Sequence, residues 1–156
     1  MDREDFMREA IRLSIDNVEK ARGGPFGAVV VKDGKIIATG ANSVTATNDP
    51  TAHAEVVAIR EACKVLNSFQ LEGCEIYTSC EPCPMCLGAI YWARPDKLFY
   101  ANSKEDASAV DFDDKFIYEE LAKPIEKRQL FTQRMLHDEA IEAFHKWNES
   151  PMKTEY

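Results

Sequence analysis

The first hydrophobic pattern in the chain has the spacing of an amphipathic helix. Between residues 5 and 22, core-facing positions recur at near-helical intervals, which places them on one face of a helix. These positions are Phe6, Ala10, Leu13, Asn17 and Val18. The run Gly23-Gly24-Pro25 follows, and because glycine and proline interrupt helices, the helix is predicted to end there.

Two strands joined by a tight turn are predicted next. Residues 26–32 and 35–40 are short runs of mainly apolar residues, the first of them rich in β-branched side chains, and they flank Asp33-Gly34. An Asp-Gly pair between two such runs is a strong signal for a β-hairpin. We therefore expect the sheet to begin with an antiparallel pair.

Helices and strands alternate through the rest of the chain. A polar loop at 43–51 ends in Asp49-Pro50-Thr51, whose threonine can cap the helix that follows. The elements predicted after it are a helix at 52–66, a strand at 75–78, a helix at 84–92, a strand at 97–100, a helix at 116–121, a strand at 130–135 and a helix at 139–148. This alternation predicts an α/β fold with helices on both faces of a mixed sheet.

Length and charge restrict the class of protein. A chain of 156 residues with 45% hydrophobic residues suits a single domain over residues 1–156. No apolar run approaches the roughly 20 residues of a membrane span. The acidic N-terminus lacks the features of a secretory signal, which suggests the cytoplasm and no membrane partner. The net charge of -8 disfavours a nucleic-acid partner, because such proteins usually present a basic face.

The cysteines indicate metal chemistry. The chain has 5 cysteines, and an odd count in a cytoplasmic chain argues against a disulfide framework. Cys80, Cys83 and Cys86 lie close together in the sequence. Two short motifs stand at predicted helix starts, and they are His53-Ala54-Glu55 and Pro82-Cys83-Pro84-Met85-Cys86.

These motifs predict an open zinc site. Cys83 and Cys86 share a face of their helix, and a helix N-terminus lowers the pKa of a thiol. With His53 they supply three protein ligands, and a catalytic zinc leaves its fourth position to water. Because zinc lowers the pKa of that water, zinc-bound hydroxide is the expected nucleophile. Glu55, two residues beyond His53, is the predicted catalytic proton shuttle.

A structural zinc site is the alternative for these residues. A Cys-x-x-Cys pair alone is often a closed zinc knuckle or a redox pair. A closed site needs a fourth ligand, and Cys80 is the only near candidate. His-x-Glu followed by Pro-Cys-x-x-Cys is the signature of zinc nucleobase deaminases, and this combination favours the catalytic interpretation.

Further segments extend this pattern over nearly the whole chain. They are residues 23–28, 48–55, 79–95 and 112–118 and the closing Glu155-Tyr156. With them the chain resembles the cytidine deaminase superfamily, and more closely its bacterial guanine deaminases. The resemblance implies a three-layer α/β/α sandwich around a five-stranded mixed sheet. It also implies a homodimer in which the C-terminal segment, residues 137–156, is exchanged between subunits.

The reaction that the resemblance implies is the hydrolysis of guanine to xanthine and ammonia in purine catabolism, with attack at C2. Asn42 matches a substrate-binding asparagine, Asp114 matches an acidic residue that accepts ring N–H groups, and Ala54 offers a backbone N–H. Taken without the resemblance, a turn residue is the favoured interpretation of Asn42, and Asp114 could equally be a helix cap.

Three aromatic residues complete the implied substrate site. Phe26 and Trp92 are expected to stack on the flat base, and Tyr156 is expected to close the pocket as a lid. By ordinary burial preferences the first two would be core residues. Without the resemblance, the last would be a frayed terminus.

Two other functions compete with a guanine deaminase. A tRNA adenosine deaminase has the same zinc core, so the metal motifs cannot separate the two. The acidic net charge, the Phe112-Asp113-Asp114 segment and the acidic stretch at 138–156 favour a free base, because a phosphate backbone would be repelled there. A non-catalytic zinc module would leave Glu55 without a function.

Overall fold

The first helix has the capping residues that define its start. The computed structural model describes residues 1–156. In α1 (Arg3–Glu19) the Asp2 side chain accepts the N–H of Asp5, and the Asp5 side chain accepts the N–H of Asp2 in return. This reciprocal capping box satisfies N–H groups that a helix start leaves free. The predicted helix is confirmed, with both ends shifted towards the N-terminus by two or three residues.

The predicted hairpin is also confirmed. β1 (Gly27–Lys32) and β2 (Lys35–Ala41) pair antiparallel, and both turn residues, Asp33 and Gly34, have positive φ. Successive residues of β1 point to opposite faces of the sheet, as strand geometry requires. One set packs towards α3 and α4, and the other packs towards α1. The buried strand therefore supplies both halves of the core.

The helix after the polar loop begins later than predicted. The loop holds the short helix α2 (Val44–Thr47), and α3 spans Ala54–Leu66 with His53 at its N-cap. Thr51 does not cap the helix. Its N–H and its hydroxyl both donate to Asp49 Oδ1, at 2.9 and 2.7 Å, so the threonine closes the preceding turn instead.

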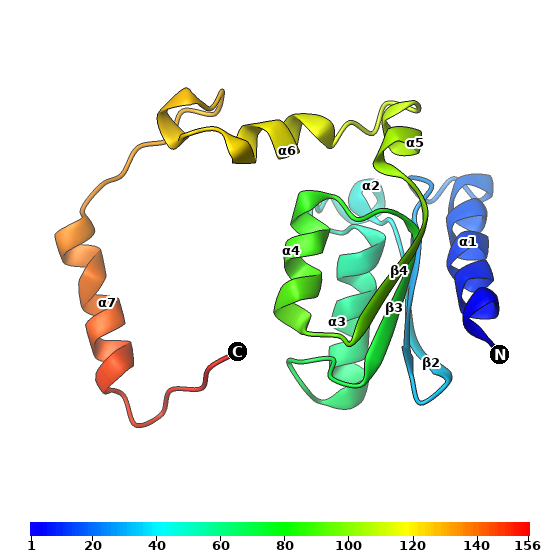
Figure 1. Ribbon diagram of the computed structural model, residues 1–156, viewed down its shortest axis with the longest axis horizontal. Coiled ribbons are helices and arrows are strands. Elements are labelled where there is room, and N and C mark those ends of the chain that lie inside the picture. The colour runs from blue at the N-terminus through cyan, green and yellow to red at the C-terminus, as the bar shows by residue number, and fades with distance from the viewer. The chain divides into compact units, whose positions relative to one another are not determined.

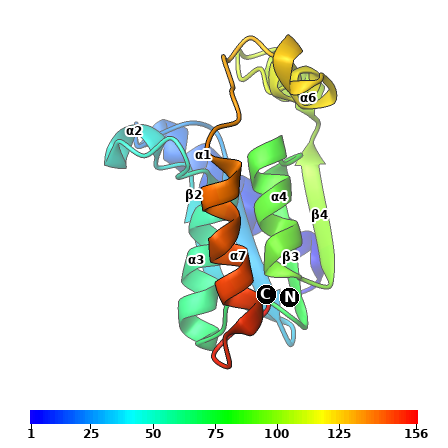
Figure 2. The same cartoon turned by 90° about the vertical axis from the view of Figure 1, so that its left-hand side faces the viewer.

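The sheet contains four strands in the order β2-β1-β3-β4. β3 (Cys74–Cys80) is antiparallel to β1, and β4 (Lys97–Asn102) is parallel to β3 after the crossover through α4 (Pro84–Ala93). Figure 1 shows α1 on one side of this sheet and α3 with α4 on the other, and Figure 2 shows α3 and α4 side by side over it. The three layers of the expected sandwich are present.

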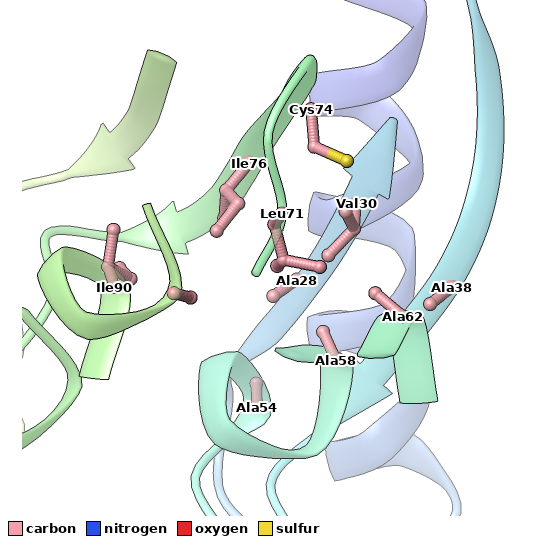
Figure 3. Close-up of a cluster of buried hydrophobic side chains, with 11 residues drawn as sticks. Ala28, Val30, Ala38, Ala54, Ala58, Ala62, Leu71, Cys74, Ile76 and Ile90 are labelled. Atoms are coloured by element: carbon pink, nitrogen blue, oxygen red, sulfur yellow. The ribbon is translucent and has the colours of Figure 1, made fainter. Parts of the chain in front are cut away.

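The core on the α3 and α4 side is built from small residues. Ala54, Ala58 and Ala62 lie along one face of α3, and Figure 3 shows them facing Ala28 and Val30 of the sheet. All five are 0% exposed. Because alanine is short, α3 can lie close to the strands, and this brings the first residues of α3 against the sheet.

The expectation of a five-stranded sheet is wrong. The predicted fifth strand, residues 130–135, has no strand conformation, and no strand pairs with it. Its Leu130 and Phe131 side chains are 79% and 84% exposed. Apolar residues of high β propensity are not sufficient for a strand, because the backbone also needs a neighbouring strand to exchange hydrogen bonds with.

The chain forms two compact units, Met1–Lys115 and Phe116–Tyr156. The first contains the sheet, every buried residue and the short α5 (Lys104–Ser108). The elements that continue the chain are α6 (Lys115–Ala122), the 3-10 helix η1 (Ile125–Lys127) and α7 (His137–Glu149). The two helices predicted for this part of the chain are thus confirmed. No helix of the protein has the length and apolar character needed to span a membrane.

Candidate active site

A close contact between a strand and a helix places the first site residues. Gly40 of β2 faces the first turns of α3, and a Cβ atom at this position would overlap the carbonyl oxygen of Ala54 and the backbone nitrogen of Ala58. Only glycine permits this approach without displacement of the helix. The start of α3, with His53 at the N-cap and Glu55 in the first turn, is thereby fixed against the sheet.

The other two predicted ligands stand at the start of α4. Cys83 is the N-cap, and its Sγ accepts the N–H of Cys86 at 3.5 Å. Pro84 occupies the first turn, where its missing N–H costs no hydrogen bond. Cys86 is fully buried, whereas Cys83 and His53 are partly exposed. Two helix N-termini therefore bring the imidazole and the two thiols together.

The geometry of this cluster fits a zinc ion. The Cys83 and Cys86 sulfurs lie 3.6 and 3.4 Å from His53 Nδ1, and the three ligand atoms all lie within 4.8 Å of one another. Ordinary zinc–sulfur and zinc–nitrogen bonds in a tetrahedral arrangement separate their ligand atoms by about 3.6 Å. The cluster has three members, and the Cys80 sulfur instead faces the carbonyl oxygen of Ser103 at 3.6 Å. The donor set is that of an open site.

The two thiols of the cluster have pKa shifts in opposite directions. Hydrogen bonding from Cys86, with a further contribution from His53, lowers the pKa of Cys83 to about 4. The hydrogen bond with Cys83 and burial in turn raise the pKa of Cys86. By contrast, burial raises the pKa of Cys80 to about 11, and this thiol stays protonated near neutral pH.

Glu55 lies beside these ligands in a protected position. It is 7% exposed, and burial raises the pKa of its carboxyl group above the usual value. Its own backbone N–H and the Cys86 thiol oppose that shift. A raised pKa favours the protonated form of the carboxyl group, and a general acid–base group has to take up and release a proton.

Asn42 and Phe26 meet at the end of the first hairpin. The Asn42 N–H donates to the Phe26 carbonyl at 3.1 Å, and its side-chain oxygen accepts the N–H of Val44 at 3.3 Å. Asn42 is 8% exposed. The Phe26 ring is partly exposed and contacts the edge of the Phe112 ring, with 4.9 Å between centroids. Ala54, at the first position of α3, is buried.

Asp114 carries a buried oxygen atom without a partner. Its Oδ1 is inaccessible to solvent and makes no hydrogen bond with the protein. Burial is the main cause of the raised pKa of this carboxyl group, and the nearby Cys83 thiolate adds to it. Because an unsatisfied buried acceptor is costly, this oxygen is available for a donor on a ligand.

Two predicted site residues, Trp92 and Tyr156, are largely exposed. Trp92 lies six residues beyond Cys86 on α4, about 9 Å along the helix axis, and is 62% exposed. Tyr156 belongs to the C-terminal unit and is 68% exposed. The interpretation of Trp92 as a core residue is excluded by this exposure.

The structure also identifies site neighbours that the sequence pattern did not single out. Asn17 was placed among the core-facing positions of α1, yet its amide donates to the Asn42 carbonyl at 3.0 Å. The Ser79 hydroxyl accepts the N–H of Gly27 at 3.0 Å and ties the end of β3 to β1. A polar residue within an apolar stripe was the available signal for Asn17.

Three side chains that can hold a metal ion, next to a shielded carboxyl group, define a metal-dependent hydrolytic enzyme of the α/β class. Residues 1–102 match the family described as the cytidine and deoxycytidylate deaminase zinc-binding region. The chain therefore belongs to the cytidine and deoxycytidylate deaminase family, and its cofactor is zinc.

Known relatives cover the chain to different extents. A guanine deaminase of Bacillus subtilis is 54% identical over 156 residues, which is 100% of both chains. The crystal structure of guanine deaminase from Bacillus subtilis has a TM-score of 0.97 and covers 100% of this chain and 99% of that one. A tRNA-specific adenosine deaminase of Aquifex aeolicus is 46% identical over 101 residues, 65% of this chain and 66% of that protein.

Proposed function

We propose that this protein is a guanine deaminase, which hydrolyses guanine to xanthine and ammonia. The observation that carries the proposal is the 54% identity to a guanine deaminase over the full length of both chains. The site is consistent with it. The unpartnered Asp114 oxygen can accept the ring N–H of guanine, a donor that the adenine ring lacks at that position.

Each step of the reaction has a side chain suited to it. Zinc on His53, Cys83 and Cys86 supplies the Lewis acidity that makes water a nucleophile at neutral pH. Glu55 takes a proton from the water that attacks C2, and delivers it to the adjacent ring nitrogen. The same carboxylate then takes the remaining proton from the oxygen now bonded to C2 and passes it to the amino group, so that the C2–N bond breaks, ammonia leaves and the C2 carbonyl of xanthine forms.

The proposed substrate contacts hold the base in place. The Asn42 amide contacts the purine edge, and the Ala54 N–H, which no intrahelical carbonyl accepts at the first position of α3, offers a backbone donor. Phe26 and Trp92 offer flat surfaces to the base, and Tyr156 closes the pocket. The proposed setting is the cytoplasm, where reducing conditions keep the five cysteines as thiols.

A deaminase that acts on adenosine in tRNA is the second candidate, because relatives of that kind match the zinc-binding part of the chain. An ammonia-release screen over guanine, adenine, cytosine, their nucleosides and tRNA separates the two. We expect guanine to react fastest. Release from tRNA with no reaction of guanine would overturn the proposal.

Asp114→Asn tests the proposed basis of guanine recognition. We expect guanine turnover to fall by at least about tenfold, because the amide replaces a charged acceptor for the ring N–H. Zinc content, measured by metal analysis, should remain that of the parent enzyme. Equal guanine rates in the two proteins would remove Asp114 from the site.

We also propose a homodimer in which the C-terminal segment 137–156 is exchanged. None of the residues after Lys115 is buried. On α7 the apolar residues Ala140, Ile141, Phe144 and Trp147 recur at helical spacing, and Phe144 is 72% exposed. A second copy of the chain is the proposed cover for this stripe, and sedimentation equilibrium measures whether the protein is dimeric.

A further inference from the structure

One polar side chain is enclosed in the core of the N-terminal unit next to the proposed substrate site. Asn17, near the end of α1, is 3% exposed. It lies on the same face of α1 as Phe6 and Ala10, which pack against the sheet. A buried amide is costly unless its hydrogen bonds are satisfied, so its partners indicate why it is there.

The Asn17 amide bridges two segments that are distant in sequence. Its Nδ2 donates to the Gly24 carbonyl at 2.8 Å and to the Asn42 carbonyl at 3.0 Å. Its backbone carbonyl accepts the N–H of Arg22 at 2.9 Å. One side chain thus connects the end of α1, the loop before Phe26 and the residue that follows β2.

The backbone of Gly23 packs closely against this bridge. A Cβ atom at Gly23 would overlap the Asn42 carbonyl oxygen and would lie 3.1 Å from Asn17 Nδ2. Asn42 in turn donates its N–H to the Phe26 carbonyl at 3.1 Å. The backbone of Asn42 is therefore held from two sides, which fixes the direction in which its side chain can project.

We infer that Asn17 is a positioning residue for guanine recognition, acting through Asn42. The inference rests on the proposed function, in which the Asn42 amide contacts the purine edge. Asn17 does not touch the base. Its two N–H donors hold the Asn42 carbonyl and the neighbouring loop in the register that directs the Asn42 amide towards the base, so its loss weakens substrate binding more than chemistry.

A double-mutant cycle on the full-length zinc enzyme tests this inference. Asn17→Ala, Asn42→Ala and the double variant are compared with the parent for KM, kcat, zinc content and thermal stability. Asn17→Asp keeps the shape of the side chain but removes both N–H donors, so it separates the hydrogen bonds from the cavity. Ser14→Ala is the matched control, because the Ser14 hydroxyl is buried one turn earlier and bonds only to the Ile11 carbonyl of α1.

We expect Asn17→Ala and Asn17→Asp to raise KM for guanine about 10- to 100-fold, as the loss of buried hydrogen bonds predicts. The zinc content should be unchanged, kcat should change much less than KM, and Ser14→Ala should leave both constants as they are. In the Asn42→Ala background the Asn17→Ala effect should shrink to less than about twofold, because residues that act as a unit are not additive.

An equal KM factor for Asn17→Ala in both backgrounds, or a KM that stays at the parental value, would overturn the inference. If Asn17→Ala does not fold, Asn17→Asp completes the cycle in its place. The proposed function fails separately, if the parent enzyme releases no ammonia from guanine. The cycle is then run on the base that the screen identifies, and the same two outcomes decide it.

Discussion

At the scale of single residues, Glu55 and the metal ligands have separate proposed roles. The thiols and the imidazole would hold the ion, whereas the carboxyl group of Glu55 is kept close to them in a nearly solvent-free position. Burial raises the pKa of this carboxyl group, and a proton carrier benefits from a pKa nearer to neutrality. A residue with a purely structural role would gain nothing from a carboxyl pKa that burial has raised.

Glu55→Gln should therefore remove turnover while leaving the protein intact. The amide has nearly the same shape but cannot carry a proton, so we expect kcat to fall by about 10²- to 10⁴-fold with zinc content and melting temperature unchanged. Steady-state kinetics and metal analysis check this expectation. Parental turnover in this variant would reject the assignment of Glu55 as the proton carrier, and would favour a zinc module without catalysis.

Removal of zinc should expose one cysteine in particular. In the metal-free protein the Cys83 thiol has a pKa of about 4, and that of Cys80 is about 11. Because the thiolate is the reactive form, iodoacetamide at pH 6 should modify Cys83 well before Cys80 after chelation. Mass spectrometry locates the label, and the zinc-loaded enzyme is the control in which Cys83 is protected. Faster labelling of Cys80 would contradict this expectation.

At the scale of elements, the site depends on how closely α3 approaches β2. The alanines of α3 and Gly40 of β2 leave no side-chain volume between the two elements. This contact between β2 and α3 fixes the positions of His53 and Glu55, although Gly40 itself takes no part in the reaction. His53, at the N-cap of α3, can therefore contribute to the site only because the whole helix is held in place.

Gly40→Ala should separate these elements and damage the site. The added methyl group has to displace the backbone of α3, so we expect a loss of about 1–3 kcal/mol in the free energy of unfolding and weaker zinc binding. Gly88→Ala is the control: Gly88 lies in α4, and a Cβ there would meet no atom within 4 Å. Urea denaturation should show no loss for the control, since alanine favours a helix.

At the scale of the whole molecule, the C-terminal unit has apolar surface that its own residues do not cover. Phe131, Phe144 and Leu130 are all at least 72% exposed. A subunit exchange would bury such surface and would bring Tyr156 of one chain to the site of the other. The proposal therefore predicts a functional consequence as well as an oligomeric state.

Subunit mixing tests whether the tail acts on the partner. Glu55→Gln has an intact tail but no proton carrier, and Tyr156→Ala has an intact site but no lid, so each alone should be nearly inactive. Random reassembly of equal amounts makes half of the dimers mixed, each with one complete site. We expect about a quarter of the parental activity. Activity no higher than the mean of the two separate variants would mean that the lid does not act in trans.

The local elements were predictable because their signals lie close together in sequence. The Asp33-Gly34 turn, the α1 stripe and Pro84 at the start of α4 each indicate the conformation of their own neighbourhood. The helix cap at Thr51 failed because the threonine had a nearer partner in Asp49. The strand at 130–135 failed because strand pairing depends on a distant segment that local pattern does not specify.

The sequence by itself determined which residue types are available for the chemistry and their spacing at two helix starts. Only the tertiary structure decided how these groups meet. The 3.4 and 3.6 Å separations of the sulfurs from His53 and the bridge from Asn17 to Asn42 join distant segments. The burial of the Asp114 oxygen without a partner likewise results from the fold around it. Spacing along a chain fixes neighbours within one element, whereas contacts between elements depend on how their faces pack.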